Sequence, residues 1–109
     1  MPTRQTSHSL ERIAEVCRAL GDLTRLAVVH ELLKHGEKNV GELAARLNES
    51  QPNISKHLKR LRRVGLLSRR KDGLQVFYRL ADPRIGQLWQ VLKGSIPKNS
   101  QTKRTHAAV

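Results

Sequence analysis

The fold is decided by the stretch Ser50-Gln51-Pro52-Asn53-Ile54-Ser55-Lys56-His57-Leu58-Lys59-Arg60-Leu61-Arg62-Arg63. Ile54, Leu58 and Leu61 recur at spacings of four and three, which predicts a helix with one buried face. The other face is cationic, and no carboxylate occurs from residue 50 through residue 71. A basic helix that starts with small hydrogen-bonding side chains suits the major groove of DNA. There, cations contact phosphates while Gln, Asn and Ser reach base edges.

The basic helix over residues 51–63 is called the recognition helix below. The flanking residues predict where it begins and what precedes it. Ser50 can cap it, Pro52 is tolerated in its first turn, and Gly65 stops it. Before it, Asn39 caps a shorter helix whose inward side chains are apolar, namely Val40, Leu43, Ala44 and Leu47. Residues 48–49 supply a tight polar turn, and two short helices joined in this way form a helix-turn-helix.

Beyond Gly65 the hydrophobic pattern changes from a helical period to that of a strand. Two β-prone runs, residues 66–70 and 75–80, flank the tripeptide Lys71-Asp72-Gly73. Asp-Gly between two such runs predicts a β-hairpin. A hairpin directly after the recognition helix is the order of a winged helix. Its tip would carry three cations toward flanking phosphates: Arg69, Arg70 and Lys71.

Two helices are predicted before the helix-turn-helix. Ser9 caps the first, which ends at Gly21 and carries an apolar stripe of Leu10, Ile13, Cys17 and Leu20. Asp22 caps the second, which ends at Gly36. This second helix is apolar over most of its surface, as expected of the central helix of a core.

A last helix is predicted from Asp82-Pro83, a cap followed by proline at the first helical position. Gly94 or Pro97 ends it, and its apolar stripe consists of Ile85, Leu88, Trp89 and Leu92. Since the earlier helices already supply the core of so small a domain, we expect this stripe to be buried against a partner chain. The alternative is that it packs only on its own domain.

These elements predict a mainly α fold with a β-hairpin wing, in the order ααααββα, forming a dimeric winged helix-turn-helix. The DNA-binding domain is expected over residues 9–94, with a flexible arm at 1–8 and a basic disordered tail at 95–109. The terminal helices would form the dimer interface through seven residues: Leu10, Ile13, Cys17, Ile85, Leu88, Trp89 and Leu92.

Charge is unevenly distributed along the 109 residues, whose formal net charge is +12. Residues 1–50 hold seven Lys or Arg and seven Asp or Glu, whereas residues 51–109 hold fourteen against two. A cationic half beside a neutral half implies a polyanionic partner, here double-stranded DNA. The basic helix lacks the apolar face that membrane binding needs. With no bilayer-spanning run, no signal peptide and one cysteine, the sequence predicts a soluble cytoplasmic protein.

Five segments in order carry a family pattern: residues 19–26 (ALGDLTRL), 41–44 (GELA), 50–61 (SQPNISKHLKRL), 65–67 (GLL) and 77–80 (FYRL). Together they resemble the ArsR/SmtB family of dimeric bacterial winged-helix repressors, over about residues 10–94. The resemblance implies a homodimer built on the first and last helices, a palindromic operator, and repression relieved by a signal. It places the base-reading positions at Gln51, Asn53, Ser55 and His57.

The metal ligands of that family are not matched. Where thiolate-type members carry two cysteines, this sequence has Asn39 and Gly41. Where other members carry four ligands on the last helix, the positions hold Asp82, Arg84, Ser95 and Lys98. Arg and Lys are not ordinary metal ligands and repel a cation. Residues 36–43 are closer to sulfide-responsive members, whose switch needs two cysteines, and this chain has only Cys17. We therefore predict no metal site and no cofactor, and the effector stays unidentified.

Three single residues have alternative roles. Cys17 lies on an apolar stripe, which favours a buried structural thiol over an intersubunit disulfide or sulfenate switch. His30 borders the apolar face of the second helix, which favours packing over metal ligation. His57 lies within the recognition helix, which favours a phosphate or base contact. No nucleophile–base pair or paired carboxylates can be argued from spacing, so we predict no catalytic site and no enzyme activity.

The sequence thus favours a sequence-specific transcriptional regulator, a metal-independent repressor that binds a palindromic operator as a homodimer. One alternative is a repressor that senses metal or thiol redox state through an atypical site. Another is a winged-helix module for protein contacts or non-specific nucleic-acid binding. The predicted DNA contacts are Gln51, Asn53, Ser55, Lys56, His57, Lys59, Arg60, Arg62, Arg69, Arg70 and Lys71.

Overall fold

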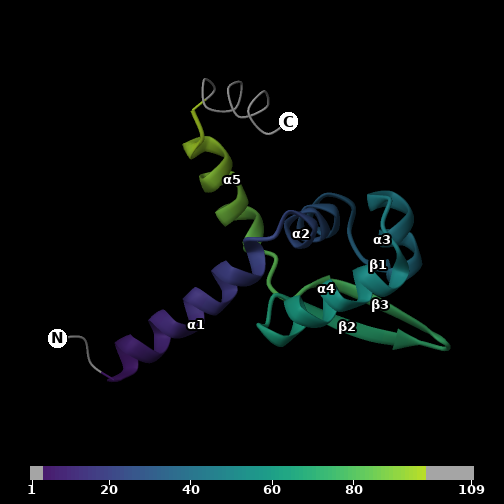
Figure 1. Cartoon of the computed structure of the whole chain (residues 1–109), viewed down its shortest axis with the longest axis horizontal. Helices are drawn as coiled ribbons and strands as arrows, with labels where there is room; N and C mark the ends of the chain where they lie inside the picture. The colour runs from purple at the N-terminus through teal and green to yellow at the C-terminus, as the bar shows by residue number, and fades with distance from the viewer. Residues whose placement is uncertain (1–3, 98–109) are drawn as a thin grey trace.

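The computed structural model describes residues 4–97, with side chains from residue 8 onward. Eight elements follow one another along the chain (Figure 1): α1 (Arg4–Leu20), α2 (Leu23–His35), β1 (Lys38–Asn39), α3 (Val40–Leu47), α4 (Gln51–Arg63), β2 (Leu67–Asp72), β3 (Gln75–Leu80) and α5 (Ile85–Ser95). Helices α3 and α4 form the predicted helix-turn-helix, and residues 67–80, called the wing below, form the predicted hairpin. The winged helix-turn-helix is confirmed, with β1 as an additional strand.

The predicted caps of the three central helices are present. The Asp22 carboxylate accepts a hydrogen bond from the Arg25 backbone N–H at 3.0 Å, and the Ser50 hydroxyl accepts one from Asn53 N–H at 3.2 Å. Asn39 and Glu42 form a reciprocal capping box at the start of α3, with bonds of 2.8 and 2.9 Å. Each cap satisfies backbone donors that have no partner within the helix.

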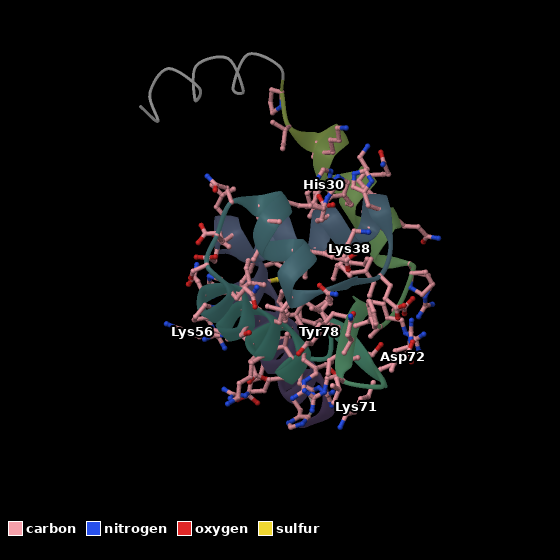
Figure 2. The ribbon with its side chains drawn as sticks, turned by 90° about the vertical axis from the view of Figure 1, so that its right-hand side faces the viewer. His30, Lys38, Lys56, Lys71, Asp72 and Tyr78 are labelled. Atoms are coloured by element: carbon pink, nitrogen blue, oxygen red, sulfur yellow. The ribbon has the colours of Figure 1, made fainter. Side chains whose placement is uncertain are left out.

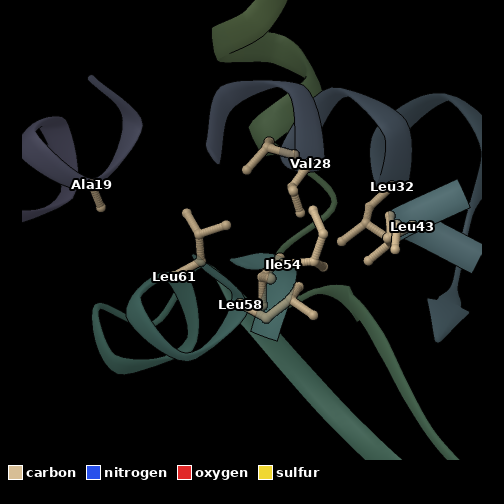
Figure 3. Packing of buried hydrophobic residues seen from close by; sticks show 10 residues of the cluster. Ala19, Val28, Leu32, Leu43, Ile54, Leu58 and Leu61 are labelled. Atoms are coloured by element: carbon tan, nitrogen blue, oxygen red, sulfur yellow. The ribbon is translucent and has the colours of Figure 1, made fainter. Parts of the chain in front are cut away.

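The core lies where α2, α3 and α4 meet (Figure 3). Ten apolar side chains are buried there: Ala19, Val28, Val29, Leu32, Leu43, Ala44, Ile54, Leu58, Leu61 and Leu67. Helix α2 supplies three of them, as its broad apolar surface predicts. Because the stripe of α4 is fully buried, its opposite face must point to solvent.

The sheet has three antiparallel strands in the order β1-β3-β2. Asp72 pairs with Gln75, so Gly73 and Leu74 form the connection, and Gly73 adopts a φ of +64° that favours glycine. Strand β1 pairs Lys38 with Tyr78 next to the wing. Two residues are too few for a sequence period, and β1 exists only through its pairing with the distant β3, so the sequence did not predict it.

The first helix begins at Arg4, five residues before the predicted start at Ser9. Residues 4–8 are therefore helical and not a flexible arm. No Gly or Pro interrupts residues 4–20, so a serine that could cap the helix lies inside it instead. Cys17 is exposed, not buried as predicted, because the described residues leave this part of the α1 stripe uncovered, whereas Leu20 at its end packs on the core. The predicted arm at 1–3 and the tail beyond residue 97 lie outside the described residues.

The last helix begins at Ile85, two residues after the predicted start at Pro83. The Asp82 carboxylate accepts hydrogen bonds from the Arg84 backbone N–H at 2.9 Å and from its guanidinium at 2.8–3.1 Å. Residues 82–87 make bonds between residues three apart, so they form a tight turn that leads into α5. The carboxylate organises this turn in place of the helix end, since such a side chain can bond its neighbouring backbone without a helix.

Candidate nucleic-acid interface

The outward face of α4 carries most of the predicted contacts. Gln51, Ser55, Lys56, Lys59 and Arg60 are exposed, and Asn53 and Arg62 are half-buried. The hydrogen-bonding residues occupy the first turns and the cations follow toward the C-terminal end. The Asn53 side-chain amide already donates to the Glu49 carboxylate at 2.7 Å. A base contact by Asn53 would have to replace or share that hydrogen bond.

His57 does not share the exposure of its neighbours, since its side chain is only 16% exposed. Its Nδ1 lies 3.3 Å from an Arg25 guanidinium nitrogen and 4.0 Å from the Asp22 carboxylate. A guanidinium can only donate, so Nδ1 is the acceptor in a hydrogen bond between these two groups. The sequence placed His57 among the base-reading residues, whereas the structure turns it toward the start of α2.

Arg25 connects three helices and was not singled out from the sequence. Its Nε donates to the Ala19 carbonyl at 2.6 Å, and a second nitrogen lies 3.4 Å from the Arg18 carbonyl. These carbonyls belong to the last turn of α1, where backbone acceptors lack helical partners. The backbone N–H of Arg25 also lowers the pKa of the Asp22 carboxyl. Arg25 thereby joins the end of α1 to α2 and to His57 of α4.

The wing places its cations on opposite faces of the sheet. Arg69, Arg70 and Lys71 are all exposed, but within the described part of the chain only Arg70 is paired: its guanidinium donates three hydrogen bonds of 2.7–3.0 Å to the Glu37 carboxylate. The hydrogen-bonded guanidinium lowers the pKa of the Glu37 carboxyl, and the carboxylate raises the pKa of Arg70. Figure 2 shows Lys56 and Lys71 on opposite sides of the lower half of the molecule. The two cationic elements are thus separate contact regions.

A cleft of about 760 Å³ between α1 and the end of α4 adds further cations. Arg12 and Arg18 of α1 line it together with Arg60 and Arg63 of α4. The charge pattern did not indicate Arg12 and Arg18, because they belong to a segment without net charge. The cationic region therefore extends from the recognition helix onto α1.

The seven predicted interface residues divide into exposed and packed groups. Leu10 and Ile13 are 57% and 58% exposed, Leu88 and Leu92 are 44% and 53% exposed, and Cys17 is exposed. Ile85 is half-buried. Trp89 is also half-buried and stacks on His30 of α2, with ring centroids 4.8 Å apart, which confirms His30 as a packing residue. One side of α5 thus packs on its own chain while another is uncovered.

Residues 4–97 offer neither a cluster of metal ligands nor a helix that could span a membrane. Within this range, no group of three or more metal-binding side chains comes together. None of the helices in the same range has the length and apolar character needed to cross a membrane. The carboxylates are scattered, and the one buried among the described side chains, Glu31, forms an ion pair with Arg46. It is therefore a structural group inside the fold.

Comparison with known proteins identifies a family. The family model described as "Bacterial regulatory protein, arsR family" matches residues 22–69. An HTH-type transcriptional regulator of Methanocaldococcus jannaschii, described as uncharacterized, is 36% identical over 72% of this chain and 88% of its own length. The arsenical resistance operon repressor of Escherichia coli is 46% identical over 62% of this chain and 57% of its own length.

Solved structures agree with this assignment. The homodimeric winged helix-turn-helix DNA-binding domain of a possible ArsR-family regulator from Mycobacterium bovis has a TM-score of 0.75, with 26% identity over 85% of each chain. The transcriptional repressor BigR from Xylella fastidiosa has a TM-score of 0.72, with 30% identity over 89% of this chain and 98% of that one. The chain belongs to the arsR family of DNA-binding bacterial regulatory proteins.

Proposed function

We propose that this chain is a sequence-specific transcriptional repressor that binds a palindromic operator as a homodimer. The observation that carries the proposal is the division of α4 into two faces. Ile54, Leu58 and Leu61 are completely buried, so the helix is held rigidly against the core. Its other face offers hydrogen-bonding side chains first and cations after them, an arrangement that supports base reading together with phosphate contact.

A dimer is supported by the geometry of recognition and by the exposed stripes of α1 and α5. One recognition helix contacts only a few base pairs, too few to specify a site in a genome. Two helices about 34–36 Å apart read successive major grooves on one side of the duplex. The exposed leucines of α1 and α5 supply apolar surface for such an association, and the M. bovis relative is described as homodimeric.

Metal independence is part of the proposal. Asn39, at a position where the family resemblance places a thiolate, caps α3, and Asp82 is held by the guanidinium of Arg84. The pKa of the Asp82 carboxyl lies at about 2 because of the hydrogen bonds from Arg84. Titration of zinc, nickel and cobalt into the operator complex should leave binding unchanged. Release of the operator at micromolar metal, if His30→Ala abolished it, would contradict metal independence. It would leave the rest of the proposal standing.

The function is tested by selecting a palindrome from random duplexes and measuring its affinity against unselected DNA. A specific regulator should prefer its palindrome by about 10³-fold or more, whereas a non-specific binder or a module for protein contacts shows no preference. The slope of log K against log salt should be near −7 if about four cations per subunit contact phosphates. A slope shallower than about −3 would exclude this face as the DNA surface.

The cations assigned to phosphate contact are Lys56, Lys59, Arg60, Arg62, Arg69 and Lys71. Base reading is assigned to Gln51, Asn53 and Ser55 at the start of α4. His57 and Arg70, predicted as DNA contacts from the sequence, are instead engaged in contacts within the protein.

A further inference from the structure

The wing is tied to the segment between α2 and α3 by an ion pair between Arg70 and Glu37. Arg70 of β2 meets Glu37 through two guanidinium nitrogens, at distances of 2.7–3.0 Å. The guanidinium also lies over the Phe77 ring, 4.8 Å from its centroid, and 3.6 Å from the Asp72 carboxylate. Two carboxylates and an aromatic ring together fix the direction of this one side chain.

The position of the Glu37–Arg70 pair in the sheet lets it influence the orientation of the wing. Phe77 is the register partner of Arg70 on β2 and of Asn39 on β1. The Asn39 side-chain amide adds a hydrogen bond to Gln75 at 3.1 Å, nearer the wing tip. Beyond these contacts the wing extends away from the core (Figure 1). The Glu37–Arg70 pair thus acts with the β1–β3 pairing and the core packing of Leu67 to set the angle between the wing and the helix-turn-helix.

The neighbouring cations differ from Arg70 in their surroundings. Side chains alternate between the two faces of a strand, so Arg69 and Lys71 project from the face opposite Arg70. Both are exposed, and no ion pair to either occurs within residues 4–97. A cation without an internal partner can neutralise a phosphate and release a counterion on binding, whereas Arg70 would first have to leave Glu37.

We propose that Glu37 and Arg70 are positioning residues for DNA binding, which hold the wing so that Arg69 and Lys71 meet the phosphates beside the recognition helix. Arg70 itself does not contact phosphate. This inference rests on the proposed function, because it assigns roles within the same DNA-binding surface. It adds the α2–α3 segment, which contains Glu37, to the parts of the chain that control DNA affinity.

The sign of the effect at Glu37 distinguishes positioning from simple electrostatics. Removal of a carboxylate near a polyanion reduces repulsion and should tighten binding if charge alone matters. Removal of the partner that orients the wing should weaken binding. The proposal therefore predicts that Glu37→Gln lowers operator affinity, up to about fivefold, since both partners are partly exposed and such pairs are screened by solvent.

The experiment measures operator affinity as a function of salt for Glu37→Gln, Arg70→Gln and the matched control Arg69→Gln. The control should weaken binding and make the slope shallower by about 1.8, which is two phosphate contacts per dimer. Arg70→Gln should weaken binding with the slope unchanged. The exchanged pair Glu37→Arg with Arg70→Glu should bind more tightly than either of its single substitutions.

Amide hydrogen exchange without DNA separates this inference from the proposed function. Glu37→Gln and Arg70→Gln should speed exchange in β3 relative to Arg69→Gln, whether or not a palindrome is preferred. Tighter operator binding by Glu37→Gln would overturn the positioning role, as would a slope change for Arg70→Gln equal to that of the control. Equal exchange rates in all three variants would do the same.

Discussion

Helices α4 and α1 have the same kind of sequence pattern and opposite surroundings. In α4, Ile54, Leu58 and Leu61 are completely buried. In α1, Leu10 and Ile13 at similar spacing are more than half exposed. The hydrophobic period thus predicts which face of a helix is apolar, but the position of the helix in the fold decides whether this chain covers that face.

The position of each helix explains the difference. Helix α4 lies against α2 and α3, while α1 and α5 project from the rest of the molecule (Figure 1). Among the described residues of α1 only Ala19 is buried, and α5 has no buried residue. The apolar stripe of α4 therefore stabilises the single chain, whereas the apolar stripes of α1 and α5 are available for contact with a second chain.

The largest effect that tests this comparison is expected at Leu58. Leu58→Ala removes a completely buried side chain and should lower the free energy of unfolding by about 2–5 kcal/mol. Ile13→Ala, on a side chain that is 58% exposed, should have an effect that grows with protein concentration, because it acts through association. Urea unfolding followed by circular dichroism at two protein concentrations measures both. Equal, concentration-independent losses would refute the distinction.

The next effect should appear in association. Leu92→Asp places a charge on the exposed stripe of α5 and should raise the dimer dissociation constant at least about 30-fold, because an unpaired carboxylate would be buried between subunits. Operator affinity should fall with it. Leu23→Asp is the matched control, since Leu23 is 82% exposed and lies outside both stripes. Sedimentation that shows equal dimerisation of both variants would argue against the terminal helices as the interface.

The sequence predicted most of the fold because its signals are local. Asp22, Asn39 and Ser50 each cap a helix within three residues, and Gly73 shapes the wing turn by its own backbone angle. These features depend on a few neighbouring residues, so they can be predicted from the sequence alone. Strand β1 depends on a partner far along the chain, and it was missed for that reason.

The roles of single site residues were harder to predict, because they depend on contacts between distant segments. His57 and Arg70 carry the residue types expected of DNA contacts, yet each has a partner 32 or 33 positions away, Arg25 and Glu37 respectively. A charge pattern cannot reveal such pairs. It did reveal the exposed cations of α4, because no carboxylate lies near them in the sequence.

A smaller and more selective effect distinguishes two residues on the exposed side of α4. Asn53→Ala should reduce the preference for the operator by about 1–3 kcal/mol, because the amide is assigned to a base edge. Lys59→Ala should weaken operator and random DNA alike, because a phosphate contact carries no sequence information. Fluorescence anisotropy with the operator duplex and with a random duplex gives the ratio of the two affinities for each variant. The assignments fail if the ratio of operator to random-DNA affinity changes equally in both variants.

The smallest effect is expected at Asp82, in the tight turn that leads into α5. Arg84 holds the pKa of the Asp82 carboxyl at about 2, below its ordinary value of 3.8, so the folded state favours the ionised form. Its stabilising contribution is therefore complete above the unfolded pKa and is lost as the pH falls from about 4 through about 2. Asp82→Asn should be slightly less stable than the native chain near neutral pH, with the difference disappearing toward pH 2. The contribution is small because solvent screens both exposed side chains. Carboxyl carbon NMR of the native chain measures the pKa directly, and an Asp82 value near 3.8 would show that Arg84 does not hold the turn in solution.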